Sequence, residues 1–100
     1  MPTVYVTAPE STADELAATL VDERLAACVN AVDCRSTYRW EGEVTTDDET
    51  ILLLKTTEAA ADRLTERIEE LHPYDVPCIE RFDETDLLAR FGAWIDESVD

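Results

Sequence analysis

The sequence has few of the residues that interrupt a chain, with only 2 glycines and 4 prolines among 100 residues. No stretch rich in glycine, proline or serine separates two parts, so we expect residues 1–100 to form a single domain. The longest aliphatic run, residues 51–54, is far shorter than the roughly 20 residues that a membrane span needs. Neither of the common glycine-rich phosphate-binding motifs occurs, which excludes the usual nucleotide-binding loops.

Positive charge is also scarce, because 8 Lys and Arg residues face 24 Asp and Glu residues, for a formal net charge of −16. The basic residues are scattered singly, and Lys55 is the only lysine. Such a chain repels phosphate, so we expect neither a nucleic acid nor a membrane as partner. The bias is typical of an acidic surface adapted to a salt-rich, halophilic cytosol. The N-terminus has no readable signal peptide, and we expect a cytoplasmic protein.

Three cysteines, Cys28, Cys34 and Cys78, are spaced without a Cys-x-x-Cys motif, which argues against a disulfide framework and a closed zinc site. We therefore expect free thiols. His72 is the only histidine, so a Cys–His pair is the one nucleophilic arrangement available. Cys28 and Cys34 share a predicted strand face with Tyr38, where a buried thiol behaves as a small hydrophobic side chain. We expect the protein not to be an enzyme.

Strand signals occur at four places. Residues 4–6 form a short β-type run, and residues 28–40 alternate strictly between two faces, which predicts a long strand. Residues 41–43 supply a turn, after which residues 44–57 return as a second long strand. Residues 76–82 predict a last strand.

Three helices are predicted between and after these strands. They run from a capping box at residues 11–15 to about residue 27, from residue 58 to His72, and from a cap at residue 85 or 86 toward the C-terminus. The second helix stops at His72 because Pro73 disfavours the helical conformation of the residue before it. Apolar stripes expected in the core include Leu16, Leu20, Leu64, Ile68, Phe91 and Ile95.

The element order is β-α-β twice, followed by one helix, which predicts an α+β, ferredoxin-like fold with a four-stranded antiparallel sheet. Both crossover helices are expected on one face of the sheet. Strands of about 13 residues are longer than the usual five or six, so the long hairpin should project beyond the sheet. Its uncovered edges and apolar side chains predict a cyclic homo-oligomer.

The residues suited to metal binding are isolated in the sequence. Imidazole and thiolate ligands suit copper or zinc, and carboxylates supply harder ligands. His72 is either such a ligand or only the C-cap of the second helix. Cys78 follows Pro77 at a strand start and points either into a cleft or into the core. The segment 72–77, in which two prolines bracket an aromatic and an acidic residue, is either a plain connector or one wall of a cleft.

Several motifs, in order over nearly the whole chain, resemble those of the CutA divalent-cation tolerance family. They are Thr-Ala-Pro at 7–9, Glu-Arg-Leu-Ala-Ala-Cys-Val-Asn at 23–30, Ser-Thr-Tyr-Arg-Trp-Glu-Gly-Glu at 36–43, Leu-Lys-Thr at 54–56, His-Pro-Tyr-Asp-Val-Pro at 72–77 and Trp-Ile at 94–95. The resemblance implies a ferredoxin-like trimer, similar to PII signalling proteins, whose hairpins extend across subunit boundaries.

The same resemblance implies a role in the tolerance or binding of divalent metals, copper foremost, without a catalytic reaction. No nucleotide or organic cofactor is expected. A metal would be bound by His72 with Cys28 or Cys78. The cleft between subunits would draw on Cys28, Tyr38, Trp40, Glu41, Lys55, His72 and Tyr74.

Two hypotheses follow. In the first, the protein is a trimer that binds copper, zinc or another divalent cation. In the second, it is a signalling or interaction module of the PII type, whose intersubunit cleft binds a small molecule or a protein partner. Either trimer would carry a formal charge of three times −16, or −48, so we expect its assembly to require salt.

Overall fold

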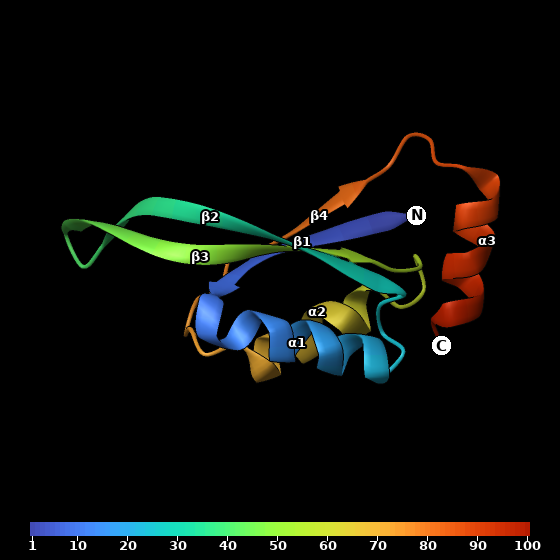
Figure 1. Ribbon diagram of the computed structural model, residues 1–100, viewed down its shortest axis with the longest axis horizontal. Helices are drawn as coiled ribbons and strands as arrows, with labels where there is room; N and C mark the ends of the chain where they lie inside the picture. Colours follow the sequence, from blue (N-terminus) through green and yellow to red (C-terminus); the bar gives the residue numbers. More distant parts are fainter.

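The computed structural model describes residues 1–100 and has the order of elements that the sequence predicts (Figure 1). The elements are β1 (Pro2–Pro9), α1 (Glu10–Asp22), β2 (Cys28–Trp40), β3 (Glu43–Lys55), α2 (Ala61–Leu71), β4 (Ile79–Asp83) and α3 (Ala89–Ser98). The strands form one sheet in the order β2-β3-β1-β4, and every neighbouring pair is antiparallel. This confirms the predicted ferredoxin-like α+β fold.

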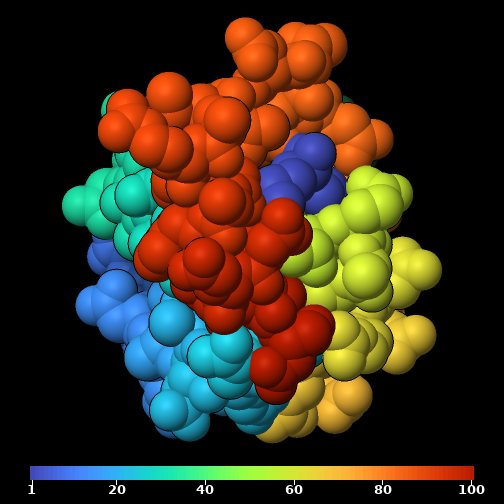
Figure 2. Space-filling model, turned by 90° about the vertical axis from the view of Figure 1, so that its right-hand side faces the viewer, coloured from blue at the N-terminus to red at the C-terminus, as the bar shows by residue number.

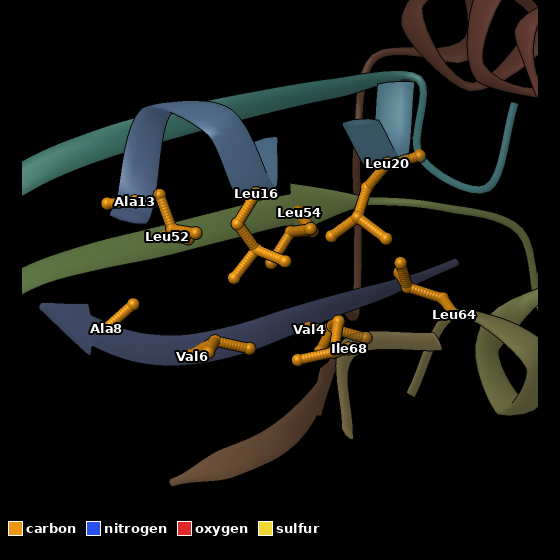
Figure 3. Packing of buried hydrophobic residues seen from close by; sticks show 11 residues of the cluster. Val4, Val6, Ala8, Ala13, Leu16, Leu20, Leu52, Leu54, Leu64 and Ile68 are labelled. Carbon is orange, nitrogen blue, oxygen red and sulfur yellow. The ribbon is translucent and has the colours of Figure 1, made fainter. Parts of the chain in front are cut away.

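The main core lies between the sheet and the two helices α1 and α2, which cover the same face (Figure 3). Alternate residues of the two central strands point toward the helices and are fully buried, among them Val4 and Val6 of β1 and Leu54 of β3. Each such side chain contributes roughly 1.5–3 kcal/mol through its burial. The helices supply Ala13, Leu16, Leu20, Leu64 and Ile68.

Helix α1 is shorter than predicted, ending at Asp22 instead of near residue 27. Arg24 takes a left-handed conformation with φ of 60°, its N–H donates to the Val21 carbonyl, and the Leu25 N–H donates to the Leu20 carbonyl. This pair of bonds is a Schellman motif, which usually places glycine where this chain has arginine. The predicted capping box is wrong as well, since no side chain caps the first turn and the Thr12 hydroxyl donates to the Pro9 carbonyl.

The other boundaries also differ by a few residues. Helix α2 begins at Ala61 after a turn, and it ends at the predicted place, with His72 as its C-cap. Helix α3 begins at Ala89 without a side-chain cap, because the preceding Leu87 packs against a second cluster and keeps that segment extended. Strand β4 begins at Ile79 and not at residue 76, since Pro77 has no N–H to donate to β1.

The strands β2 and β3 form a long hairpin that projects from the rest of the molecule, as predicted (Figure 1). A two-residue turn joins them, in which Glu41 and Gly42 both have positive φ, as a type I′ turn requires. Strand β1 pairs with β3 only as far as the Pro9–Glu49 pair. Residues 35–48 therefore pair only with each other, and we call this two-stranded part the arm.

The face of the sheet opposite α1 and α2 has no layer over it. Val32 on β2 and Phe82 on β4 are 48% and 50% exposed on this face. Tyr5 lies between them on β1 and contacts the edge of the Phe82 ring at a centroid distance of 5.9 Å. We call this surface the open face; exposed apolar side chains of this kind indicate a contact surface.

Helix α3 packs across the end of the sheet away from the arm (Figure 2). Ile95 and Val99 form a small second cluster with Ala27 and Ala60. The C-terminal residue Asp100 is held by Arg24, whose Nε lies 2.6 Å from its carboxylate, and by hydrogen bonds from Arg63 and to the Arg24 carbonyl. The last helix therefore closes this end, which leaves the arm end and the open face uncovered.

One ion pair links α1 to α2. Nε and Nη2 of Arg67 each lie 2.8 Å from a carboxylate oxygen of Glu23. The hydrogen bond and the charge of Arg67 lower the pKa of Glu23 below its usual value. A lowered carboxyl pKa stabilises the fold above the unfolded-state value, and this stabilisation is lost as the pH falls through the folded-state value.

We predict that Glu23→Gln lowers the melting temperature at pH 7 and that its difference from the parent protein begins to decrease near the ordinary glutamate pKa of about 4.3 and is lost as the pH falls through the lower folded-state pKa. Thermal unfolding followed by circular dichroism from pH 3 to pH 7 measures this difference. The control is Glu69→Gln, which changes an exposed residue of α2 that forms no ion pair. A pH-independent difference for Glu23→Gln would contradict the prediction.

Candidate functional site

A cavity of about 590 Å³ lies where the arm leaves the sheet. Its walls come from the end of β1, from β2 and β3 at the base of the arm, and from the connector between α2 and β4, which passes the end of β1 (Figure 1). This volume is within the range of small-molecule sites in proteins. The lining residues are Thr7, Ser36, Tyr38, Trp40, Glu49, Pro73, Tyr74, Asp75, Val76 and Cys78.

Three aromatic side chains form much of the wall. Tyr38 and Trp40 lie two residues apart on β2, so the alternation of the strand places both on the open face with Ser36. Tyr74 comes from the connector, where its ring lies 4.9 Å from the His72 ring, measured between centroids. Tyr38, Trp40 and Tyr74, which the family resemblance places in a cleft between subunits, all line this cavity of the single chain.

The two tyrosine hydroxyls in this wall donate hydrogen bonds to carboxylates of β3. Tyr74 Oη lies 2.9 Å from Glu49 Oε2, and Tyr38 donates to Asp47. Burial and the bond to Glu49 raise the pKa of Tyr74 to about 12, and the bond to Asp47 raises the pKa of Tyr38. Both rings are therefore neutral near pH 7, with their hydroxyl protons already engaged.

Glu49 is the buried acid of the site, with only 5% of its surface exposed. None of the ion pairs of the chain includes it, and no lysine or arginine lines the cavity. A carboxylate rarely lies this deep without a positive partner. The cavity therefore combines aromatic faces with negative charge that no cation of the chain neutralises.

His72 lies behind the cavity, buried against the end of β1. The Tyr74 backbone N–H donates to Nδ1, at 3.1 Å, so the proton of the neutral ring is on Nε2, which donates to the Thr7 carbonyl at 2.8 Å. Its backbone N–H caps α2 through the Ile68 carbonyl. Both ring nitrogens are thus engaged in holding the connector to β1.

The cysteines are spread over the open face and are free thiols, as predicted. Cys78 lines the cavity, where its Sγ lies 3.6 Å from Glu80 Oε1, and burial and Glu80 raise its pKa. Cys28 pairs with Lys55 at the other end of the hairpin, and burial raises its pKa while Lys55 opposes the shift. Cys34 lies opposite Glu49 in the β2–β3 pairing.

The residues predicted for one site thus separate into several groups within the single chain. The cavity contains Tyr38, Trp40, Tyr74 and Cys78. Cys28 and Lys55 lie at the far end of the hairpin, Glu41 lies in its exposed turn, and His72 is behind the wall.

Cys28 begins β2 and Cys78 immediately precedes β4, and these two strands are at opposite edges of the sheet, three strand spacings of about 4.8 Å apart. No three His, Cys, Asp or Glu side chains of this chain are grouped so that they could hold a metal ion. The predicted set of His72, Cys28 and Cys78 therefore does not form a metal site within one subunit.

Sequence reasoning missed the acid that matters most to the cavity, Glu49. The signal that could have found it is its place on β3 in the same alternation as Asp47, directly opposite Cys34. In a chain with 24 acidic residues this pattern does not distinguish a buried carboxylate from a solvated one. Thr7 and Ser36 were missed for the related reason that their side chains are common on surfaces, whereas Asp75 belongs to the segment 72–77 that the sequence offered as a cleft wall.

Comparison with known proteins assigns the family. The family model described as "CutA1 divalent ion tolerance protein" matches residues 2–98. The divalent-cation tolerance protein CutA of Pyrococcus horikoshii is 44% identical over 95 residues, which cover 94% of this chain and 93% of the relative. The crystal structure of CutA1 from the same organism has a TM-score of 0.96 at 42% identity and covers 100% of this chain and 99% of its own.

More distant relatives keep the same fold. The structure described as "PII-like protein CutA" from Nostoc sp. PCC 7120 has a TM-score of 0.94 at 31% identity and covers 98% of this chain and 97% of its own. A structure from Archaeoglobus fulgidus, with a TM-score of 0.94 at 32% identity and full coverage of both chains, is described as a periplasmic divalent cation tolerance protein. A further relative, 40% identical over 97 residues that cover 95% of this chain and 53% of its own, is described as chloroplastic in Arabidopsis thaliana, so relatives are described from more than one compartment.

These comparisons agree with the structure of the chain itself. Its four-stranded sheet, its long hairpin and its C-terminal helix are all included in alignments that span nearly its whole length. None of its helices has the length and hydropathy required to cross a bilayer. The chain belongs to the CutA1 divalent ion tolerance family, a non-catalytic family with a PII-like fold.

Proposed function

We propose that this protein, as a single domain of 100 residues, assembles into a cytoplasmic homotrimer that binds a divalent metal ion, copper or zinc, between its subunits. In this way it would contribute to metal tolerance without catalysis. The observation that carries the proposal is the arm, which pairs with no other strand of its own chain and extends an uncovered apolar face. A two-stranded ribbon of this kind is marginally stable alone and gains stability from a partner.

The sheet offers two free edges for assembly. The outer edge of β2 and the outer edge of the short strand β4 have no neighbour within the chain. Contacts between such unlike edges form a closed ring when the rotation from one subunit to the next completes a full turn, and a closed ring satisfies every edge without open-ended growth. The CutA resemblance implies three subunits in that ring, and the exposed Val32 and Phe82 lie where neighbours would cover them.

The same ring would complete a metal site. Cys28 belongs to the β2 edge and Cys78 precedes β4, so the two thiols approach each other only when edges of different subunits meet. Glu80 beside Cys78 supplies a harder ligand, and a mixed thiolate and carboxylate set accepts zinc or copper. His72 enters this site only if it gives up one of its two ring hydrogen bonds.

The second hypothesis, a PII-type module that binds a small ligand, has its own support. The Nostoc relative is described as PII-like, and the cavity at the base of the arm has the volume of a small-molecule site. The two hypotheses are compatible, because the metal ligands and the cavity share only Cys78. We favour metal binding over the binding of a small ligand, because the description of the matching family names divalent ions.

For the assembly, we predict a trimer in 1 M salt, where charges are screened beyond about 3 Å, and its dissociation by Val32→Lys. An unpaired ammonium buried in the interface would cost several kcal/mol. The control is Val21→Lys, which makes the same charge change at an exposed residue of α1, away from the open face. Size-exclusion chromatography with light scattering measures the mass of each protein.

We expect three chains per particle for the parent protein and for Val21→Lys, and a smaller particle for Val32→Lys. Circular dichroism establishes that each variant is folded. A monomeric parent protein at this salt concentration contradicts the proposed trimer. Equal masses for the two lysine variants would show that the open face is not the interface.

For the metal, we predict that Cys78→Ser and Cys28→Ser each weaken zinc binding at least about tenfold, as expected when a metal site loses a group that holds the ion. Isothermal titration of the metal-free protein with zinc measures the affinity and the number of sites. Zinc is chosen because it does not oxidise thiols. The control is Cys34→Ser, which removes a thiol from the same face outside the proposed ligand set.

His72→Ala separates a ligand role from a structural role. The substitution leaves the Thr7 carbonyl and the Tyr74 N–H without their partner, so we expect it to lower the free energy of unfolding by about 2 kcal/mol. We expect zinc affinity close to that of the parent, because both ring nitrogens of His72 are already engaged in hydrogen bonds. A tenfold loss in this variant would make His72 a ligand, and equal affinity in all variants would contradict the proposed metal site.

A further inference from the structure

We propose that the cavity at the base of the arm binds a small organic cation with a methylated ammonium group, held between aromatic faces with Glu49 as its counter-ion. The inference rests on the second hypothesis above, a PII-type ligand site, and names the chemical class of that ligand. It concerns a different set of contacts from the proposed metal site, because Trp40, Tyr74 and Glu49 are not proposed as metal ligands.

Aromatic side chains form much of the cavity wall. Tyr38, Trp40 and Tyr74 converge on one cavity from two separate parts of the chain. The negative face of an aromatic ring attracts a cation within about 6 Å of its centroid, and tryptophan does so most strongly. Several such faces around one cavity are the arrangement by which proteins recognise quaternary ammonium groups.

The cavity also contains a buried carboxylate that has no basic partner in its wall. Only 5% of the surface of Glu49 is exposed. Its carboxylate accepts one side-chain hydrogen bond, from the neutral hydroxyl of Tyr74. Asp75 lines the same cavity, and no basic side chain does. Buried charges in proteins are paired, so a bound cation would supply the partner that this chain lacks.

The lining of the cavity favours an organic cation over a metal ion and over a simple amine. A metal ion needs three or more donors close together, and the chain groups no such set. A primary amine needs an acceptor for each N–H, whereas half of the residues that line the cavity are aromatic or apolar, namely Tyr38, Trp40, Pro73, Tyr74 and Val76. A methylated ammonium group donates no N–H bonds and is attracted by the rings and by net charge alone.

The volume of the cavity and the negative net charge of the chain also favour an organic cation. About 590 Å³ leaves room for a ligand of several carbon atoms, far more than a bare ion fills. The net charge of −16 opposes anionic ligands such as nucleotides and attracts cations toward the cavity.

Titration calorimetry with choline tests the inference on the full-length protein as it assembles, at constant ionic strength. The comparison ligand is the uncharged analogue of choline in which carbon replaces nitrogen, which has the same shape. We expect saturable binding of one choline per chain. The affinity for the uncharged analogue should be at least about tenfold lower. Equal binding of the two ligands would show an apolar pocket and overturn the inference.

A matched pair of variants locates the site without changing the charge. Trp40→Leu removes a ring from the cavity, and Trp94→Leu removes a comparably exposed ring from α3; the two side chains are 53% and 42% exposed. We expect Trp40→Leu to weaken choline binding about tenfold and Trp94→Leu to leave it unchanged. Tyr74→Phe keeps the ring and should keep the binding, whereas Tyr74→Leu should lose it.

Measuring particle mass, zinc binding and choline binding on the same samples tests the choline site separately from the proposed trimer and metal site. A folded trimer that binds zinc but shows no saturable choline binding overturns the inference alone. Choline binding by a protein that is monomeric or does not bind zinc overturns the proposed trimer or metal site instead. Equal choline affinity in Trp40→Leu and Trp94→Leu would place any choline outside the cavity and overturn the inference.

Discussion

The structure depends on a mismatch in length between its two central strands. Strand β1 has 8 residues and β3 has 13, so backbone pairing between them ends at the Pro9–Glu49 pair. Beyond this point β3 has only β2 as a neighbour, and the arm leaves the sheet. The cavity lies at that junction because the end of β1 leaves space that the connector after α2 only partly fills. The arm, the cavity and the uncovered edges are therefore consequences of one difference in strand length.

The acidic residues of the chain include many that are exposed to solvent and one, Glu49, that is buried. Most carboxylates are exposed, where they stay solvated and add to long-range repulsion between molecules. Glu49 differs, because it is buried beside aromatic rings with no basic partner. A net charge of −16 describes the surface, whereas one carboxylate in a cavity can determine what binds there. The same distinction applies to the thiols, of which only Cys78 lines the cavity.

Much of the fold was predictable from local patterns. The alternation over residues 28–40 predicted β2 with its correct faces, and Pro73 predicted the end of α2 at His72. The end of α1 was not predictable in this way, because Arg24 adopts a conformation for which the usual signal is glycine. The start of α3 was missed because packing of Leu87 against a distant cluster outweighed the capping residues. Of the residues that the family resemblance assigns to a cleft, Tyr38, Trp40 and Tyr74 line one cavity, whereas Cys28 and Lys55 lie at the other end of the hairpin.

The sequence by itself determined the order of strands and helices, the faces of the long strands and the family, because these follow from periodicity and motifs that are read along the chain. Only the tertiary structure decided which groups meet. It buried Glu49, gave both ring nitrogens of His72 to hydrogen bonds and placed Cys28 and Cys78 at opposite edges of the sheet. These outcomes depend on contacts between residues far apart in sequence, such as His72 with Thr7 and Tyr74 with Glu49. No local pattern encodes such contacts. The alternation of residues along a strand or helix is the same whether a given side chain will contact a distant side chain or water.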